Sequence, residues 1–327
     1  MAAPLAPSAP PAPPAPRAPL APRRPPAATP PPPPPPSPAA ALRRNVEPHR
    51  GLPGLIAKRT QTFSLAGPDE AFMGRSRLLL DVVFDRYFRV QGEGWDRLPD
   101  VPSLLVGVHA GATLTMDAWM LVYAWWRRFG ADRVLHGTAH DVLLALPALG
   151  ELFRRGGVIP ASARSVGAAL AAGHDVVVWP GGEKDSMRAW TRRDQVELAG
   201  RTGFVRQAIR SGVPLVPVAT VGGSDTAPVL FEGGWVARRL GGKRLLRAEM
   251  CPVVLGPPFG IALEILPAHI PLPAKIRFEL LDPIDVGDDP DRVDDPAHVR
   301  QLYTEVERSI QAGVTRLARR RRFPLFG

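Results

Sequence analysis

The sequence predicts an α/β protein in which a mostly parallel central sheet is covered by helices on both faces. Two patterns support this prediction. Short apolar runs typical of buried strands alternate along the chain with segments of helical spacing, and small or polar residues follow directly after the strands. Strands separated by helices form parallel sheets, and ligands of such sheets gather at the carboxyl ends of the strands. We expect a single domain of this kind, preceded by a disordered tail.

The expected tail comprises residues 1–50, which are rich in alanine and hold 20 of the 40 prolines of the chain. Proline lacks a backbone N–H and fixes φ, so this segment is unable to build a helix or a sheet. Residues 51–99 are expected as a lead-in, with an apolar helical stripe from Asp69 onward and a short strand at 87–90. Residues 100–318 are the expected main domain, and 319–327 a basic C-terminal tail.

Within the main domain, uninterrupted apolar runs bounded by proline, glycine or polar residues predict buried strands. Amphipathic spacing between these runs predicts the helices, and Asp295 followed by Pro296 suits the start of the last one. Strands are expected at 103–108, 175–179, 215–221 and 275–281, and helices at 117–129, 165–173, 204–210 and from 295 to the basic tail.

The charge of the chain is concentrated at its two ends. The formal net charge is +10, yet residues 1–50 carry six arginines and one acid, and residues 315–327 carry five arginines and no acid. The body between them has 30 basic and 30 acidic residues. A neutral body disfavours a nucleic-acid-binding domain, so we expect no nucleic-acid partner.

Other classes are disfavoured by missing signals. A single cysteine, Cys251, leaves no internal disulfide and no cysteine-based zinc site. We find no apolar run of spanning length and no secretory leader, so we expect a cytoplasmic protein. The sequence also lacks a P-loop and a dinucleotide-binding glycine motif, and the segment 222–226 lacks the last glycine of a nucleophile elbow.

The first stretch with the residues for catalysis is 106–117 (VGVHAGATLTMD), where a strand ends at His109 and Asp117 opens the next helix. A carboxylate that accepts a hydrogen bond from one imidazole nitrogen fixes the tautomer, which makes the other nitrogen a base for a hydroxyl group. We therefore take His109 and Asp117 as the candidate catalytic pair. Gly111, Ala112 and Thr113 leave room for a substrate close to the backbone.

The second such stretch is 176–188 (VVVWPGGEKDSMR), where a strand ends in a tight Gly-Gly turn with cationic side chains just beyond it. Free backbone N–H groups and nearby cations suit a phosphate or a developing oxyanion. The candidate substrate-binding residues of this stretch are Pro180, Gly181, Gly182, Glu183, Lys184 and Arg188.

A competing hypothesis rests on His136 and His140, which have the i, i+4 spacing of a shared metal site on a helix. Together with His109 they would make a metal-dependent hydrolase. Gly137 stands where a metalloprotease helix would carry its glutamate, so two partly exposed histidines in a polar turn remain the simpler interpretation.

Four blocks in order resemble the glycerolipid acyltransferase superfamily, which includes lysophosphatidate and diacylglycerol acyltransferases. The blocks are the His…Asp motif at 109–117, GVIPA at 157–161, WPGG at 179–182 and VPLVPV at 213–218. The resemblance implies a glycerol-phosphate-acyltransferase-like fold and transfer of an acyl group from acyl-CoA, as co-substrate, to a hydroxyl group of a glycerolipid or another lipid alcohol. It implies His109 as general base, Asp117 as its orienting group, and no metal or prosthetic group. It also implies that the turn at 180–184 binds phosphate or helps to hold the acyl donor.

The departures from the family pattern bear on the acceptor. His109 and Asp117 are separated by seven residues instead of the usual four, Gly181 replaces a glutamate, and Ala161 stands where an arginine is usual. The lost charges belong to positions associated with a phosphorylated acceptor. The pattern is closest to the diacylglycerol acyltransferase-like branch, which favours an uncharged lipid alcohol. The longer spacing also leaves open a non-catalytic lipid-binding module on the same fold.

Membrane association is expected from two groups of residues. A helix at 117–129 would present Trp119, Trp125 and Trp126 beside Arg127 and Arg128, as interfacial helices do. The arginine cluster at 316–322 would add attraction to anionic lipid. We expect a protein peripherally bound to the cytoplasmic face of a membrane, and the sequence carries no signal for an oligomeric state.

Overall fold

The computed structural model describes residues 63–239, 250–264, 269–321 and 323. The expected tail at 1–50 and the first part of the lead-in lie outside these residues. The strands are β1 (Gln91–Glu93), β2 (Leu104–Val106), β3 (Leu135–Ala139), β4 (Ile159–Pro160), β5 (Asp175–Val178), β6 (Leu215–Val221), β7 (Val229–Phe231), β8 (Val253–Gly256), β9 (Gly260–Leu263) and β10 (Arg277–Leu280). The α-helices are α3 (Glu70–Val82), α4 (Met116–Phe129), α5 (Asp141–Ala145), α6 (Pro147–Arg155), α7 (Ala163–Ala171), α8 (Glu183–Ser186), α9 (Gly203–Ser211), α10 (Gly223–Thr226), α11 (Gly234–Arg239) and α13 (Pro296–Arg319).

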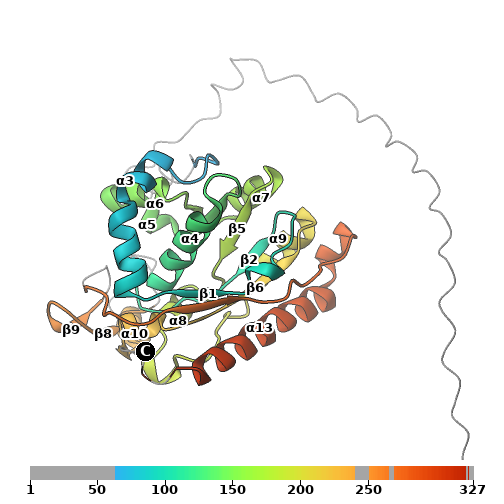
Figure 1. Cartoon of the computed structure of the whole chain (residues 1–327). Helices are drawn as coiled ribbons and strands as arrows, with labels where there is room; N and C mark the ends of the chain where they lie inside the picture. Colours follow the sequence, from blue (N-terminus) through green and yellow to red (C-terminus); the bar gives the residue numbers. More distant parts are fainter. Residues whose placement is uncertain (1–62, 240–249, 265–268, 322, 324–327) are drawn as a thin grey trace, which may run out of the picture. The chain divides into compact units, whose positions relative to one another are not determined.

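A seven-stranded sheet in the order β1-β10-β6-β2-β5-β3-β4 forms the centre (Figure 1). The strands from β6 to β4 pair in parallel, and β10 pairs antiparallel to β6. β1 pairs parallel to β10. The predicted mostly parallel sheet is therefore confirmed, with two strands of opposite direction at one edge.

Helices cover both faces of this sheet, as predicted (Figure 1). On one face, residues of α3 and α4 pack with Leu105 and Val177 of the central strands. On the other face, residues of α7, α9 and α13 pack with Leu104 and Val176. Neighbouring residues of one strand point to opposite faces, so a continuous apolar run is what a strand buried on both sides requires.

The last helix follows the sequence prediction closely. The Asp295 side chain accepts a hydrogen bond from the backbone N–H of Ala297 (2.9 Å) and caps α13. The apolar stripe through Val306 and Ile310 is fully buried against the sheet. Gly313 lies so close to β6 that a Cβ there would stand 2.6 Å from the Cβ of Ala219.

The lead-in differs from the prediction. The segment expected as a strand at 87–90 begins with the end of a π-helical turn, Val83–Tyr87, which continues α3, and the strand follows only at 91–93. Leu79 and Val82 belong to the apolar helical stripe expected from Asp69 onward, yet they are 68% and 50% exposed. Helical periodicity identifies a face of a helix, but it leaves open whether the protein supplies a partner for that face.

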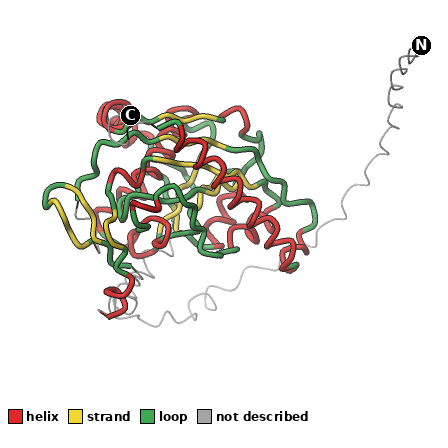
Figure 2. The backbone as a smooth tube through the Cα atoms, turned by 90° about the horizontal axis from the view of Figure 1, so that it is seen from below, coloured by secondary structure: helices red, strands yellow, loops and turns green. Residues whose placement is uncertain are grey.

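Two features of the fold have no counterpart in the prediction. β3 inserts between β5 and β4, at a segment in which polar residues interrupt the apolar pattern. A separate antiparallel sheet in the order β7-β8-β9 follows β6 along the chain. Its strand pair β8–β9 projects at the left of the views in Figure 1 and Figure 2.

The prediction that the helix at 117–129 presents its tryptophans to a bilayer is wrong for Trp125, and Trp119 and Trp126 are only partly exposed and pack against the same core. Trp125 is 1% exposed, and its indole N–H donates to the carbonyl oxygen of Arg133 (2.8 Å). Trp119 stacks on Phe153 with ring centroids 4.9 Å apart. These rings belong to the layer between α4 and its neighbours, because the helix buries its aromatic face against the sheet. Among the helices that the structure describes, none is both long and apolar enough to cross a bilayer.

The C-terminal arginines are engaged with carboxylates of the body. Arg316 pairs with Glu279 (2.9 Å) and Arg320 with Glu93 (3.1 Å). Arg321, which is 8% exposed, pairs with the buried Asp225 (2.6 Å). Much of the predicted free cationic cluster at 316–322 therefore attaches the end of α13 to the protein, and Arg322 lies outside the described residues.

Candidate active site

Three neighbouring strands end at one edge of the central sheet and place the candidate residues there. β2 lies between β5 and β6 and pairs in parallel with both. The chain leaves β2 toward His109, leaves β5 toward Trp179 and the Gly-Gly turn, and leaves β6 toward α10. The two chemistry-bearing stretches of the sequence thus meet at a common edge, where the turn after β6 joins them.

The turn after His109 has an unusual backbone. Gly111 has φ +90°, and the non-glycine residues Ala112 and Thr115 have φ +59° and +35°. A Cβ at Gly111 would stand 2.7 Å from the carbonyl oxygen of Gly223, so only glycine allows this close approach. Left-handed backbone at residues other than glycine costs free energy and is concentrated at functional sites.

The ring of His109 stacks on the indole of Trp179, with centroids 4.5 Å apart and an interplanar angle of 9°. Gly107 makes room for this indole, because a Cβ there would stand 2.8 Å from its Nε1. The Nδ1 atom of His109 is buried and has no hydrogen-bond partner. Burial lowers the pKa of His109 to about 3, so its imidazole is neutral at physiological pH.

Asp117 lies in the first turn of α4 and is 2% exposed. Its carboxyl group lies close to Gly223 and near the backbone N–H groups of Ala118 and Ala110, but neither of its oxygens has a partner with hydrogen-bond geometry. Burial raises the pKa of Asp117 well above its usual range, and the charge of Asp185 raises it further.

The predicted hydrogen bond between His109 and Asp117 is absent from this structure. The imidazole is held by stacking on Trp179, while the residues between the pair loop outward through left-handed conformations. Both groups retain unpartnered atoms at the same edge of the sheet, which is uncommon for buried polar groups in a folded protein.

A carboxylate that sequence reasoning missed lies directly behind the histidine. Asp185 is fully buried and accepts hydrogen bonds from the backbone N–H of His109 and from the guanidinium of Arg188. Burial raises the pKa of Asp185 to about 7, although the charge of Arg188 acts in the opposite direction. The i, i+3 spacing of Asp185 and Arg188 was the available signal.

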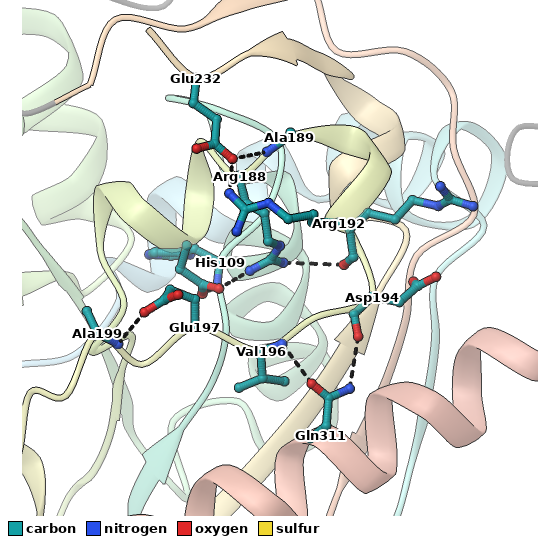
Figure 3. A network of polar contacts seen from close by, with 12 residues as sticks. His109, Arg188, Ala189, Arg192, Asp194, Val196, Glu197, Ala199, Glu232 and Gln311 are labelled. Carbon is teal, nitrogen blue, oxygen red and sulfur yellow. Dashed lines mark hydrogen bonds and ion pairs between the residues drawn. The ribbon is translucent and has the colours of Figure 1, made fainter. Parts of the chain in front are cut away.

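The anion-binding role expected for Arg188 does not fit its environment. Arg188 is 4% exposed, and its guanidinium donates to Asp185 and to the carbonyl oxygen of Arg193 (3.3 Å). Figure 3 shows it enclosed in a polar network, in which Gln311 of α13 accepts from the Val196 N–H and donates to the Asp194 carbonyl, both at 2.9 Å. The charge of Arg188 is therefore used inside the protein.

The exposed cations near the Gly-Gly turn are side chains other than Arg188. Lys184 is exposed, and Glu183 beside it is partly exposed. Arg201, which sequence reasoning missed, is exposed and donates to the carbonyl oxygen of Pro180 (2.9 Å). Gly182 has φ +56°, and a Cβ there would stand 2.6 Å from the Arg201 guanidinium. Lys184 and Arg201 thus place two exposed cationic side chains near the turn.

A second histidine–carboxylate pair holds the turn that follows His109. Glu264 is fully buried and accepts from both the backbone N–H of Thr113 (2.9 Å) and its hydroxyl group. Its other oxygen contacts Nδ1 of His269, whose Nε2 is buried without a partner. Glu264 follows β9, so the small sheet is linked to the candidate site. Thr113 and Glu264 are 151 residues apart, so no local sequence pattern indicated this contact.

The histidines of the competing metal hypothesis are not arranged as a metal site. His136 lies on β3, is fully buried, and donates from Nδ1 to the carbonyl oxygen of Gly157 (2.8 Å). Its Nε2 bonds to His174 (3.0 Å). His140 caps α5 through the Val142 N–H. The i, i+4 spacing therefore spans a strand and a helix cap, and the structure has no group of three potential ligands among its described residues.

A family model and several known proteins match this chain over much of its length. The sequence model of the diacylglycerol acyltransferase family matches residues 75–277, which include both turns of the site. An uncharacterized protein of Mycobacterium tuberculosis (strain ATCC 25618 / H37Rv) is 32% identical over 253 residues, covering 77% of this chain and 68% of that protein. Diacylglycerol O-acyltransferase 2 of Homo sapiens is 30% identical over 102 residues, covering 29% of this chain and 26% of that protein.

Among solved structures, the crystal structure of the 1-acyl-sn-glycerophosphate (LPA) acyltransferase from Thermotoga maritima covers 81% of this chain and 88% of that chain. The two share 17% sequence identity, with a TM-score of 0.44.

Proposed function

This chain belongs to the diacylglycerol acyltransferase family of glycerolipid acyltransferases, and we propose that it transfers a fatty acyl group from acyl-CoA to the hydroxyl group of an uncharged lipid alcohol. The observation that carries the proposal is that the family match spans the edge of the sheet where a neutral imidazole, that of His109, meets the Gly-Gly turn. The reaction needs no metal or prosthetic group.

His109 acts as the general base. Its imidazole is neutral at physiological pH, so a nitrogen lone pair is available for the proton of the acceptor hydroxyl as the oxygen attacks the thioester carbon; because burial lowers its pKa, the imidazolium that forms needs stabilisation from the site. The carbon–sulfur bond then breaks, the ester is formed, and the proton leaves with the CoA thiol. Trp179 orients the ring from one side, and Asp185 fixes the backbone behind it.

Asp117 stabilises the imidazolium that forms during the reaction. In the resting protein, burial favours the uncharged forms of both His109 and Asp117. A proton arriving on His109 creates an imidazolium N–H, which donates a hydrogen bond to an unpartnered carboxyl oxygen of Asp117; that proton then passes from His109 to the CoA thiolate, and Asp117 keeps its own protonation state throughout. The His109–Asp117 hydrogen bond, which is absent from the resting structure, thus forms during the reaction and stabilises the transition state.

The acyl donor binds at the turn 180–184. Lys184 and the missed Arg201 place two exposed cations beside this turn, as the phosphates of CoA require. Arg188 is buried in an ion pair, so the side of the site near His109 offers no arginine of the WPGG stretch to a phosphorylated acceptor. This favours an acceptor such as diacylglycerol over lysophosphatidic acid.

The proposed enzyme works as a peripheral protein on the cytoplasmic face of a membrane, because its acceptor resides in a lipid phase. The aromatic face of α4 is buried and gives no support to this part of the proposal. The three C-terminal arginines that form ion pairs also have a structural role, so their contribution to membrane binding is smaller than that of free cations.

A panel of acceptors tests the proposal. The purified full-length chain is incubated with labelled acyl-CoA and, separately, diacylglycerol, monoacylglycerol, a long-chain alcohol and lysophosphatidic acid, and the products are identified by mass spectrometry. Label is expected in the neutral esters. Phosphatidic acid as the main product would contradict the uncharged acceptor, and release of free fatty acid alone would contradict acyl transfer.

One observation favours a second candidate, a non-catalytic lipid-binding module. The His109–Asp117 hydrogen bond is absent from the resting structure. Lipid binding without turnover of any acceptor in the panel would select this candidate.

A further inference from the structure

The small sheet β7–β8–β9 is apolar on both of its faces. Its inner face packs Val229, Val254 and Ala262 against Ala112 of the turn that follows His109. An antiparallel sheet packed on one side normally carries polar residues on the other. Here the outer face and its turns expose large apolar side chains, with exposed fractions of 40% for Leu255, 44% for Phe231, 50% for Leu263, 52% for Leu230, 62% for Ile261 and 72% for Phe259.

The strand register gathers these side chains into one patch. Leu255 pairs with Ile261 in the β8–β9 ladder, so the two stand side by side on the same face. Phe259 is at the turn between these strands, and Phe231 at the end of β7 lies against the ring of Trp235, with centroids 6.5 Å apart. Trp235 is 58% exposed. A contiguous exposed patch of this chemistry marks an interaction site.

A group of cations follows the segment that borders the patch. Ile270 is 56% exposed, and its N–H donates to the carbonyl oxygen of Pro257 at the end of the β8 turn (2.7 Å). The chain runs from there to Lys275, whose pKa is lowered by burial and by the charges of Arg277, Arg89 and Arg321. Arg89, Lys275 and Arg277 thus gather at the end of the segment that borders the apolar patch, while the nearby Arg321 is engaged with Asp225.

We propose that the outer face of the β7–β8–β9 sheet is the surface by which this protein binds a bilayer containing anionic lipids. The apolar side chains enter the acyl boundary, Trp235 lies at headgroup depth, and the cations around Lys275 contact the phosphates. The choice of a lipid bilayer over a second copy of the chain rests on the adjoining positive charge and on the proposed function, which requires access to a lipid acceptor.

The placement of the sheet gives this surface a direct connection to the site. The inner face of the same three strands covers Ala112, and Glu264 at the end of β9 holds Thr113. A bilayer bound on the outer face therefore lies across one thin layer of protein from the turn that follows His109.

Vesicle flotation with the full-length chain tests the surface. Wild type, Phe259→Glu/Ile261→Glu and the control Val101→Glu are mixed with vesicles of phosphatidylcholine and phosphatidylglycerol. Val101 is likewise exposed (53%) but lies before β2, outside the patch. The vesicle-bound fraction of the double variant is expected to be at least tenfold lower than that of wild type, while the control binds like wild type. Lys275→Gln/Arg277→Gln is expected to weaken binding to these vesicles and not to pure phosphatidylcholine.

Equal flotation of the double variant and wild type would overturn the proposal. So would a concentration-dependent dimer in sedimentation velocity that the double variant abolishes, because the patch would then be occupied by a second copy. Circular dichroism verifies that each variant is folded. Acyl transfer to a detergent-dispersed acceptor is measured in parallel: the double variant is expected to keep wild-type turnover there, and vesicle binding without turnover in the wild type would reject the proposed function alone.

Discussion

The imidazole of His109 lies parallel to the indole of Trp179, with ring centroids 4.5 Å apart. This stacking orients a ring whose Nδ1 has no hydrogen-bond partner. We predict that Trp179→Ala lowers kcat at least about tenfold, because a base that is misoriented by a fraction of an ångström loses much of its effect. Trp179→Phe keeps an aromatic face and is expected to retain most of the activity. Steady-state kinetics distinguishes them, and equal loss in both variants would speak against a stacking role.

The low pKa of His109 predicts a pH dependence of stability. The folded-state pKa of about 3 lies below the usual 6.5, so the contribution of His109 to stability is complete above pH 6.5 and is lost as pH falls from 6.5 toward 3. Between pH 7 and 5 the wild type should lose on the order of 2 kcal/mol of unfolding free energy from this residue. His109→Gln should lose correspondingly less. Urea unfolding at both pH values measures the difference, and identical losses in the two proteins would refute the assignment.

The cations of the Gly-Gly stretch are predicted to divide into two roles. Arg188 is buried in an ion pair with Asp185, and removing one partner of such a pair typically costs about 3–5 kcal/mol. Arg188→Met should therefore lower the unfolding free energy. Lys184→Gln and Arg201→Gln should leave stability nearly unchanged and raise KM for acyl-CoA. An Arg188→Met protein that is as stable as wild type but binds acyl-CoA more weakly would contradict the structural role of Arg188.

Glu264 is predicted to hold the turn that carries Thr113. Glu264→Ala removes the acceptor of the Thr113 N–H and hydroxyl, so amide exchange across 111–114 should become at least about tenfold faster. Glu151→Ala on α6, where the glutamate is exposed, is the matched control. Hydrogen exchange with mass spectrometry reads the turn directly. Unchanged protection in Glu264→Ala would show that the turn is held by other contacts.

Local patterns predicted most of the central fold. The strand at 215–221 and the helix after Asp295 were predictable because an uninterrupted apolar run and an N-cap followed by proline are signals contained in a few neighbouring residues. The β3 strand was not, since a fully buried histidine, His136, interrupts its apolar pattern, and a tertiary partner satisfies that histidine.

The sequence predicted the candidate catalytic pair of the site but not the buried carboxylates around it. His109 and Asp117 stand near the ends of elements that the sequence reveals. Asp185 and Glu264 were missed because their roles depend on burial and on partners 76 and 151 residues away. The exposure of the apolar residues of β9 was not predictable either, because alternation along a strand does not say which of its faces meets solvent.

The central claim is that His109 is the base for acyl transfer. The most direct measurement compares wild type, His109→Ala and His140→Ala for transfer of label from acyl-CoA to diacylglycerol, with folding verified by circular dichroism. His140 caps α5 through the Val142 N–H, belongs to neither the turn after His109 nor the Gly-Gly turn, and serves as the control. We predict at least about a hundredfold lower turnover for His109→Ala and near-wild-type turnover for His140→Ala. Turnover of folded His109→Ala within a few-fold of wild type would contradict the account.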